Sequence, residues 1–174
     1  MPLTLHGAVV PNWLQLLEAT AGLLDKAEGW AQAEGVEEGE LLSARLADDM
    51  LPLAYQFKSC WVHTANAVAC CRQGVFSPHL DPPPMTYAGL RAGLEQAIAE
   101  LRALEPEALE AIADHDMAFE FRDTRLPFTV QDFLLSFSNP NAFFHAATAY
   151  DILRMKGMPI GKRDFMGRLR MKPA

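Results

Sequence analysis

The apolar positions of the chain follow a helical period over most of its length. Between residues 11 and 33, apolar side chains recur every three or four positions, which predicts one helix with a proline in its first turn and Gly35 at its end. The same period returns over residues 41–73 and predicts a second helix. This helix should be irregular at residues 48–52, because proline is tolerated at the start of a helix but not in its interior.

Two further helices follow a proline-rich connection. Residues 75–84 contain four prolines and are expected to form a loop. Thr86 is a candidate N-cap for a third helix over residues 87–104. The longest apolar helical pattern spans residues 128–157 and predicts the last helix, with a kink or a restart at Asn139–Pro140.

The period changes from helical to alternating just before the last helix. Apolar and charged residues alternate over residues 117–128 and are interrupted by turn-forming residues at 123–125, which predicts a small β-hairpin. Thr129 then caps the last helix. The sequence therefore predicts an all-α protein: a single domain over residues 1–174 that forms a four-helix bundle, with a small β-hairpin before the last helix.

The charge and the cysteine content narrow the classes of partner and compartment. A formal net charge of −7 argues against nucleic acid as a partner, because phosphate binding requires clustered lysines and arginines. No apolar run is long enough to span a membrane, and the first residues do not resemble a signal peptide. Three cysteines without a Cys-x-x-Cys pair fit free thiols in a reducing compartment, so we expect a cytoplasmic protein.

Polar groups interrupt the face of the last helix that should point into the core. Buried polar groups must be satisfied or used, so this strip is the first candidate for a functional site. His145 lies at its centre and has two interpretations: a neutral core histidine hydrogen-bonded on both nitrogens, or a metal ligand or base in a pocket. The face comprises Leu134, Ser138, Asn141, His145, Thr148 and Ile152.

His63 is the second candidate. It shares a flank of the second helix with Gln56, which lies seven residues earlier. One interpretation is a polar flank that faces solvent. The other is a flank that faces the polar strip of the last helix, so that His63 and His145 meet inside the bundle.

Three segments resemble a bacterial family of unknown function within the DinB/YfiT-like four-helix-bundle superfamily. They are ARLADDMLPLAYQ at 44–56, SNPNAFFHAATAYDILRMKG at 138–157 and MPIGKRDFMG at 158–167. The resemblance extends from about Trp13 to Gly167, which is nearly the whole chain. It implies a DinB-like bundle that forms a homodimer.

The resemblance also implies where a metal would bind. Metal-bearing relatives hold a divalent ion with three histidines, one from the second helix and two from a His-x-x-x-His pair on the last. His63 and His145 match two of these positions, but the residues four positions from His145 are Asn141 and Ala149. We therefore expect no cofactor; if a zinc or nickel ion is bound, its ligands are His63, His145 and Asn141.

Three functional hypotheses follow. The first is a bundle that binds a small molecule in a polar pocket between the second and last helices, with a degenerate metal site. The second is a divalent-metal-dependent hydrolase or thiol transferase. The third is a purely structural dimer whose polar strip is a satisfied hydrogen-bond network. The residues expected to line the pocket are Gln56, His63, Asn141, His145 and Thr148.

Overall fold

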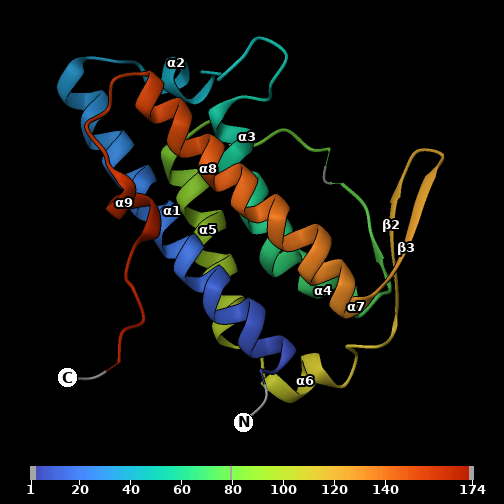
Figure 1. Ribbon diagram of the computed structural model, residues 1–174. Coiled ribbons are helices and arrows are strands. Elements are labelled where there is room, and N and C mark those ends of the chain that lie inside the picture. The colour runs from blue at the N-terminus through green and yellow to red at the C-terminus, as the bar shows by residue number, and fades with distance from the viewer. Residues whose placement is uncertain (1–2, 79, 173–174) are drawn as a thin grey trace.

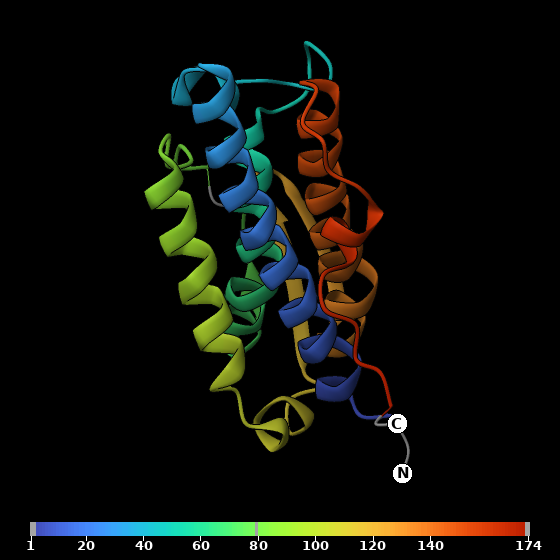
Figure 2. The same cartoon turned by 90° about the vertical axis from the view of Figure 1, so that its left-hand side faces the viewer.

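Four long helical segments pack side by side in a bundle. The computed structural model describes residues 3–78 and 80–172. The first helix packs on the third and last segments, and the second segment packs on the same two neighbours, so the four form a square (Figure 2). This confirms the predicted bundle. The segments are α1 (Leu5–Glu34), α3–η1–α4 (Leu53–Trp61, Val62–Asn66 and Ala67–Cys71), α5 (Tyr87–Arg102) and α7–η2–α8 (Val130–Asp132, Phe133–Ser138 and Asn139–Met155).

The first helix begins earlier than its apolar period predicts. Helix α1 starts at Leu5, because the Thr4 hydroxyl accepts a hydrogen bond from the Gly7 N–H and caps the first turn. Pro11 therefore lies inside the helix and not in its first turn. A proline in the interior removes one backbone hydrogen bond, and burial of the surrounding apolar side chains offsets that loss. The predicted end at Gly35 is confirmed, since this residue adopts φ 69°.

The irregular segment predicted before Pro52 is larger than expected. A short helix, α2, occupies Glu38–Leu42, and the chain is non-helical from residue 43 to Pro52. Helix α3 begins directly after this proline, whose ring leaves no N–H to satisfy at a helix start. The second predicted helix is therefore two helices separated by a loop.

Two segments of the bundle adopt the wider π-helical turn. In η1 and η2 the backbone hydrogen bonds skip one more residue than in an α-helix, which places one extra residue in the turn. The break predicted at Asn139–Pro140 takes this form: η2 ends at Ser138, immediately before the residue pair. Single π turns of this kind occur frequently at functional sites.

The connection between α4 and α5 sets the direction of the third long helix. After α4 the chain returns along the bundle before α5 begins, so α3–α4 and α5 run the same way (Figure 1). Thr86 caps α5 as predicted, with its hydroxyl accepting a hydrogen bond from the Gly89 N–H at 3.1 Å. The expected loop at 75–84 includes residue 79, which lies outside the described residues. It also contains a short strand.

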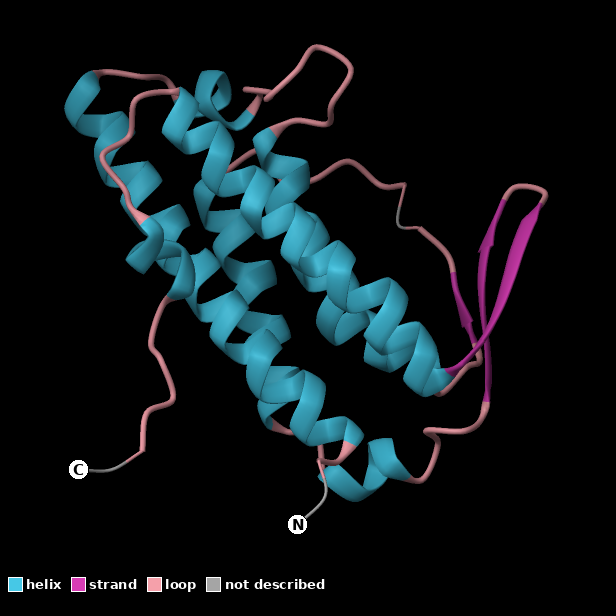
Figure 3. Cartoon of the chain, in the orientation of Figure 1, coloured by secondary structure: helices cyan, strands magenta, loops and turns pink. Residues whose placement is uncertain are grey.

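A three-stranded sheet lies at one side of the bundle (Figure 3, magenta). The predicted hairpin is confirmed, but its turn falls at Arg122–Asp123, where Arg122 has φ 53°. The unexpected strand β1 pairs in parallel with β2 and brings Phe76 opposite Phe119. Its pairing partner lies far along the chain, and no local pattern reveals such a contact. The strands are β1 (Val75–Phe76), β2 (Asp116–Phe121) and β3 (Thr124–Thr129).

The segment after α8, residues 156–172, returns along α1 as a strap. It contains the short helix α9 (Lys162–Met166); a comparably short helix, α6 (Pro106–Glu110), follows α5. The side chain of Gln15 on α1 donates a hydrogen bond to the Met166 carbonyl at 2.8 Å. Within the strap, Gly167 has a positive φ (61°), whereas Gly161 is extended (φ −136°).

Trp13 connects two helices within the core. Its indole is fully buried, and its Nε1–H donates to Oδ1 of Asn139 at 3.0 Å, which links the first and last helices. A buried indole N–H requires such a partner. In the described part of the chain, none of the helices combines the length and the apolar character that crossing a bilayer requires.

Candidate functional site

His63 and His145 come together inside the bundle. His63 is on η1 and His145 is on α8, and their ring centroids lie 5.5 Å apart with an interplanar angle of 11°. The flank that carries His63 therefore faces the polar strip of the last helix and not solvent, which is the second of its two interpretations. Helix α3 packs closely on α8, and this packing brings the two rings into contact.

Both histidines line a cavity of about 260 Å³. The two imidazoles and Asn141 are among its polar lining groups. Phenyl rings from β1, β2 and η2 form the aromatic part of the lining, and the ring centroids of Phe119 and Phe137 lie 4.9 Å apart. The full lining consists of Leu51, Tyr55, Lys58, Ser59, Val62, His63, Phe76, Pro78, Phe119, Phe137, Asn141 and His145.

Gln56 fixes the protonation of His145. The amide Nε2–H of Gln56 donates to the Leu51 carbonyl at 2.8 Å, so its Oε1 is left as an acceptor. This oxygen lies 2.7 Å from Nδ1 of His145, and an acceptor requires a donor opposite. Nδ1 of His145 therefore carries the proton, and Nε2 carries the lone pair.

Burial keeps both rings neutral. Desolvation lowers the pKa of His145 to about 4. Desolvation, with a smaller contribution from repulsion by His145, lowers the pKa of His63 to about 3. At neutral pH the cavity therefore presents two uncharged imidazoles. Nδ1 of His63 is buried and finds no hydrogen-bond partner within residues 3–78 and 80–172.

The three remaining predicted pocket residues differ in their position relative to the cavity. Asn141 lines the cavity, and its Nδ2–H donates to the Phe137 carbonyl at 2.7 Å. Gln56 is 2% exposed and lies behind His145, so it positions that ring without lining the cavity. Thr148 is buried one turn further along α8, where its hydroxyl donates to the Phe144 carbonyl at 2.8 Å. It is not part of the lining.

The apolar half of the cavity was not predicted. Phe76 falls in the segment expected to be a loop, and Phe137 lies off the predicted inward face. Phe76 contacts the His63 ring at a centroid distance of 5.5 Å, and Phe137 contacts it at 6.0 Å. The alternating pattern that contains Phe119 was the only available signal for this wall, and it predicts a strand without indicating what the strand covers.

Lys58 adds a charged group to the lining of the cavity. Its side chain is almost completely buried, its Nζ donates to the Asp81 carbonyl, and it lies 5.9 Å from the centroid of the Tyr55 ring. Burial lowers the pKa of Lys58, and the nearby Asp81 carboxylate partly opposes that shift. This residue was also missed, because it lies within an apolar helical pattern that gives no reason to expect a buried ammonium group.

The side chains around the histidines do not fit a firmly held metal ion. Within the described residues, no three His, Cys, Asp or Glu side chains come together in a group that could hold one. Asn141 would supply a third donor, but an amide oxygen is a poor partner for zinc or nickel. The nearly parallel stack of the two imidazoles also differs from the converging arrangement of ligands around one tetrahedral ion.

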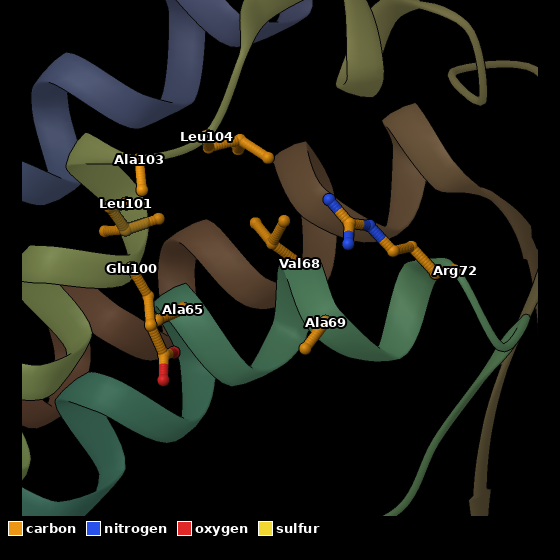
Figure 4. A pocket seen from close by; sticks show the side chains of 8 residues that line it. All are labelled: Ala65, Val68, Ala69, Arg72, Glu100, Leu101, Ala103 and Leu104. Atoms are coloured by element: carbon orange, nitrogen blue, oxygen red, sulfur yellow. The ribbon is translucent and has the colours of Figure 1, made fainter.

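A second hollow, of about 340 Å³, lies between α4 and the end of α5 (Figure 4). Its lining is mostly alkyl, and its two charged side chains, Arg72 and Glu100, stand at separate edges. A binding site for a small molecule usually combines apolar walls with a few convergent polar groups. The cavity at His63 and His145 has that combination, so we take it as the candidate functional site.

Comparison with known proteins identifies the family but not an activity. A crystal structure described as a DinB family member protein from Shewanella denitrificans is similar, with 28% sequence identity and a TM-score of 0.81. The match covers 98% of this chain and 96% of that chain, which confirms the DinB-like fold. No curated protein matches the chain. The family described as "Domain of unknown function (DUF1993)" matches residues 5–166, and the chain belongs to this family.

Proposed function

We propose that the protein binds a small, flat and largely apolar molecule in the cavity at His63 and His145. One observation carries the proposal: two neutral imidazoles, an amide and three phenyl rings, from η1, α8, β1, β2 and η2, together line a space of about 260 Å³. Burying an imidazole nitrogen without a partner is costly, and a purely packed core would replace it with an alkyl or phenyl group. This cost supports a role for the two rings beyond packing.

The size of the cavity limits the ligand. An apolar cavity of roughly 150 Å³ is sufficient for benzene, whereas drug-sized molecules occupy sites of about 300–1,000 Å³. A cavity of about 260 Å³ therefore suits a molecule with one or two fused rings. The aromatic lining favours a planar ligand, because phenyl rings pack well against other rings in offset or edge-on arrangements.

Titration with indole, followed by NMR of the histidine rings, tests the proposal. We expect the Cε1–H signals of His63 and His145 to shift in a saturable manner, with a dissociation constant on the order of 1 mM or lower. The signal of His115, which lies in an exposed turn, should not move. An Asn141→Phe variant should fill the cavity and abolish both shifts while retaining the melting temperature. If His63 and His145 show no saturable shift up to about 10 mM indole, the proposal is wrong.

A divalent-metal enzyme, either a hydrolase or a thiol transferase, is the second candidate. One observation favours it: the hydrogen bond from His145 Nδ1 to Gln56 leaves Nε2 free, as in metal-binding histidines that are oriented by an outer partner. Two imidazoles and one amide oxygen are a weak donor set for zinc or nickel, which counts against a tightly bound ion. Elemental analysis of protein purified without a histidine tag separates the candidates. Stoichiometric zinc or nickel would favour the enzyme.

A purely structural dimer is the third candidate. In that case the cavity has no ligand, indole leaves the histidine signals unchanged, and Asn141→Phe raises the melting temperature by improving the packing. The homodimer that the family resemblance implies remains a prediction, which sedimentation analysis would test.

A further inference from the structure

The hydrogen bonds around His145 determine what kind of polar group the ligand must have. Because Gln56 accepts the proton of Nδ1, the Nε2 atom of His145 can only accept a hydrogen bond. In the described part of the chain, no side chain or backbone group donates to this atom. The ring remains neutral at physiological pH, so the acceptor is not lost by protonation. A ligand that fills the cavity must therefore bring a donor to this position.

The remaining walls determine what carries that donor. The rings of Phe76, Phe119 and Phe137 form one aromatic cluster, with centroid distances of 4.9 to 6.4 Å. The Tyr55 ring meets His145 edge-on at 6.1 Å. An aliphatic alcohol would leave this aromatic surface poorly packed, whereas a planar ring would contact it over a whole face.

We propose that the cavity binds a hydroxylated aromatic compound, whose ring packs against the cluster of phenyl groups and whose O–H donates to Nε2 of His145. This inference rests on the proposed function and adds the chemical class of the ligand. Gln56 is then a positioning residue: it does not touch the ligand, but it sets the tautomer of the ring that does. The cavity admits a single phenol of ordinary size.

Two probes of nearly equal shape test the requirement for a donor. In p-xylene a methyl group replaces the hydroxyl of p-cresol, so the two probes differ only in this polar group, which is a strong donor and a weak acceptor. We expect p-cresol to bind at least about 10-fold more tightly, because p-xylene would displace water from Nε2 of His145 and offer this acceptor no donor. Equal or tighter binding of p-xylene would overturn this inference and leave the proposed function standing. If neither probe binds, both are wrong.

A variant of Gln56 tests the role of the tautomer. In Gln56→Leu the acceptor for Nδ1 is lost, so His145 is free to carry its proton on Nε2 and the preference for p-cresol should fall below about 3-fold. The affinity for p-xylene should stay the same, which controls for loss of the fold. Nitrogen-15 NMR provides a direct readout, because the two tautomers give different ring shifts. A proton found on Nε2 of His145 in the unaltered protein would overturn the inference.

Discussion

His63 and His145 stack favourably only while both rings are uncharged. Their centroids are 5.5 Å apart, and two imidazolium groups at that distance would repel each other in a site with little water. Neutral rings, in contrast, pack like any other aromatic pair. The chemistry of the cavity at the residue scale thus depends on burial, which removes the charge that these side chains would carry in a mildly acidic solution.

This burial predicts loss of stability in mild acid. The pKa of each histidine is near 6.5 in the unfolded chain but about 3 for His63 and about 4 for His145 in the folded protein. Between these values the unfolded state binds more protons, so stability decreases as the pH falls, by up to about 1.4 kcal/mol per pH unit for each ring. We expect the free energy of unfolding in urea to fall by about 2–4 kcal/mol from pH 7 to pH 5.

The matched control separates the two rings from all other titrating groups. The double variant His63→Leu/His145→Leu should lose most of this dependence on pH, whereas His115→Gln, a change in an exposed turn, should keep it. If the double variant and the unaltered protein lose stability equally between pH 7 and pH 5, the burial of the two imidazoles does not control the acid response.

The polar half of the site could be predicted from the sequence, and the aromatic half could not. A helical period places Asn141 and His145 on one face, and the same reasoning puts His63 on the flank that meets them. Phe76 and Phe137 escaped prediction for a physical reason. Phe76 reaches the site through a long-range strand pairing. Phe137 reaches it because it lies in a π turn, whose extra residue changes the direction in which side chains point compared with an α-helix.

At the scale of elements, the packing of η1 and α3 against α5 depends on one glycine. A Cβ atom on Gly93 would lie 2.9 to 3.0 Å from three carbons of the Trp61 ring, which therefore lies directly on the α5 backbone. Glycine normally weakens a helix interior by up to about 1 kcal/mol relative to alanine. Its presence here is explained by the close approach of the indole.

We predict that alanine at Gly93 and alanine at Gly22 have different effects. Gly22 lies in the middle of α1, and a Cβ atom added there would meet nothing within 4 Å, so Gly22→Ala should stabilise the protein by about 0.5–1 kcal/mol. Gly93→Ala gains the same helix propensity but must displace Trp61, and should be at least about 1 kcal/mol less stable than Gly22→Ala. Urea unfolding measures both changes.

A second variant shows whether the Trp61 indole causes the difference between Gly93→Ala and Gly22→Ala. In Trp61→Leu the ring is gone, so adding Gly93→Ala should now stabilise the protein as Gly22→Ala does. If Gly93→Ala were as stabilising as Gly22→Ala in the unaltered protein, the contact between Trp61 and α5 would not constrain this position.

The boundaries of the elements were predictable where a local signal sets them. Thr86 and Thr129 cap their helices through their own hydroxyl groups, and Gly35 ends α1 with a positive φ, so each signal lies within a few residues of its effect. The start of α1 was placed too late because the pattern after Pro11 is stronger than the cap at Thr4.

At the scale of the whole molecule, the strap after α8 ties the last helix back to the first. Its Asp164 carboxylate pairs with Lys26 and accepts a hydrogen bond from the Gly161 N–H at 2.7 Å, and burial of Ile160 anchors its start. No local pattern in residues 156–172 indicates that they follow α1. The helix on which the strap packs is determined by the arrangement of all the helices, and the apolar period of a single segment does not specify that arrangement.

Gly167 allows the strap to lie against α1, and its replacement should release the strap. The residue has φ 61°, and an added Cβ would lie 2.9 Å from Cβ of Ala19, so Gly167→Ala combines backbone strain with a collision. We expect a cost of about 1–3 kcal/mol and faster tryptic cleavage after Arg163. Gly161→Ala is the matched control, because Gly161 has an extended backbone and open space around it. Equal cleavage rates for the two variants would mean that docking of the strap does not depend on this close approach.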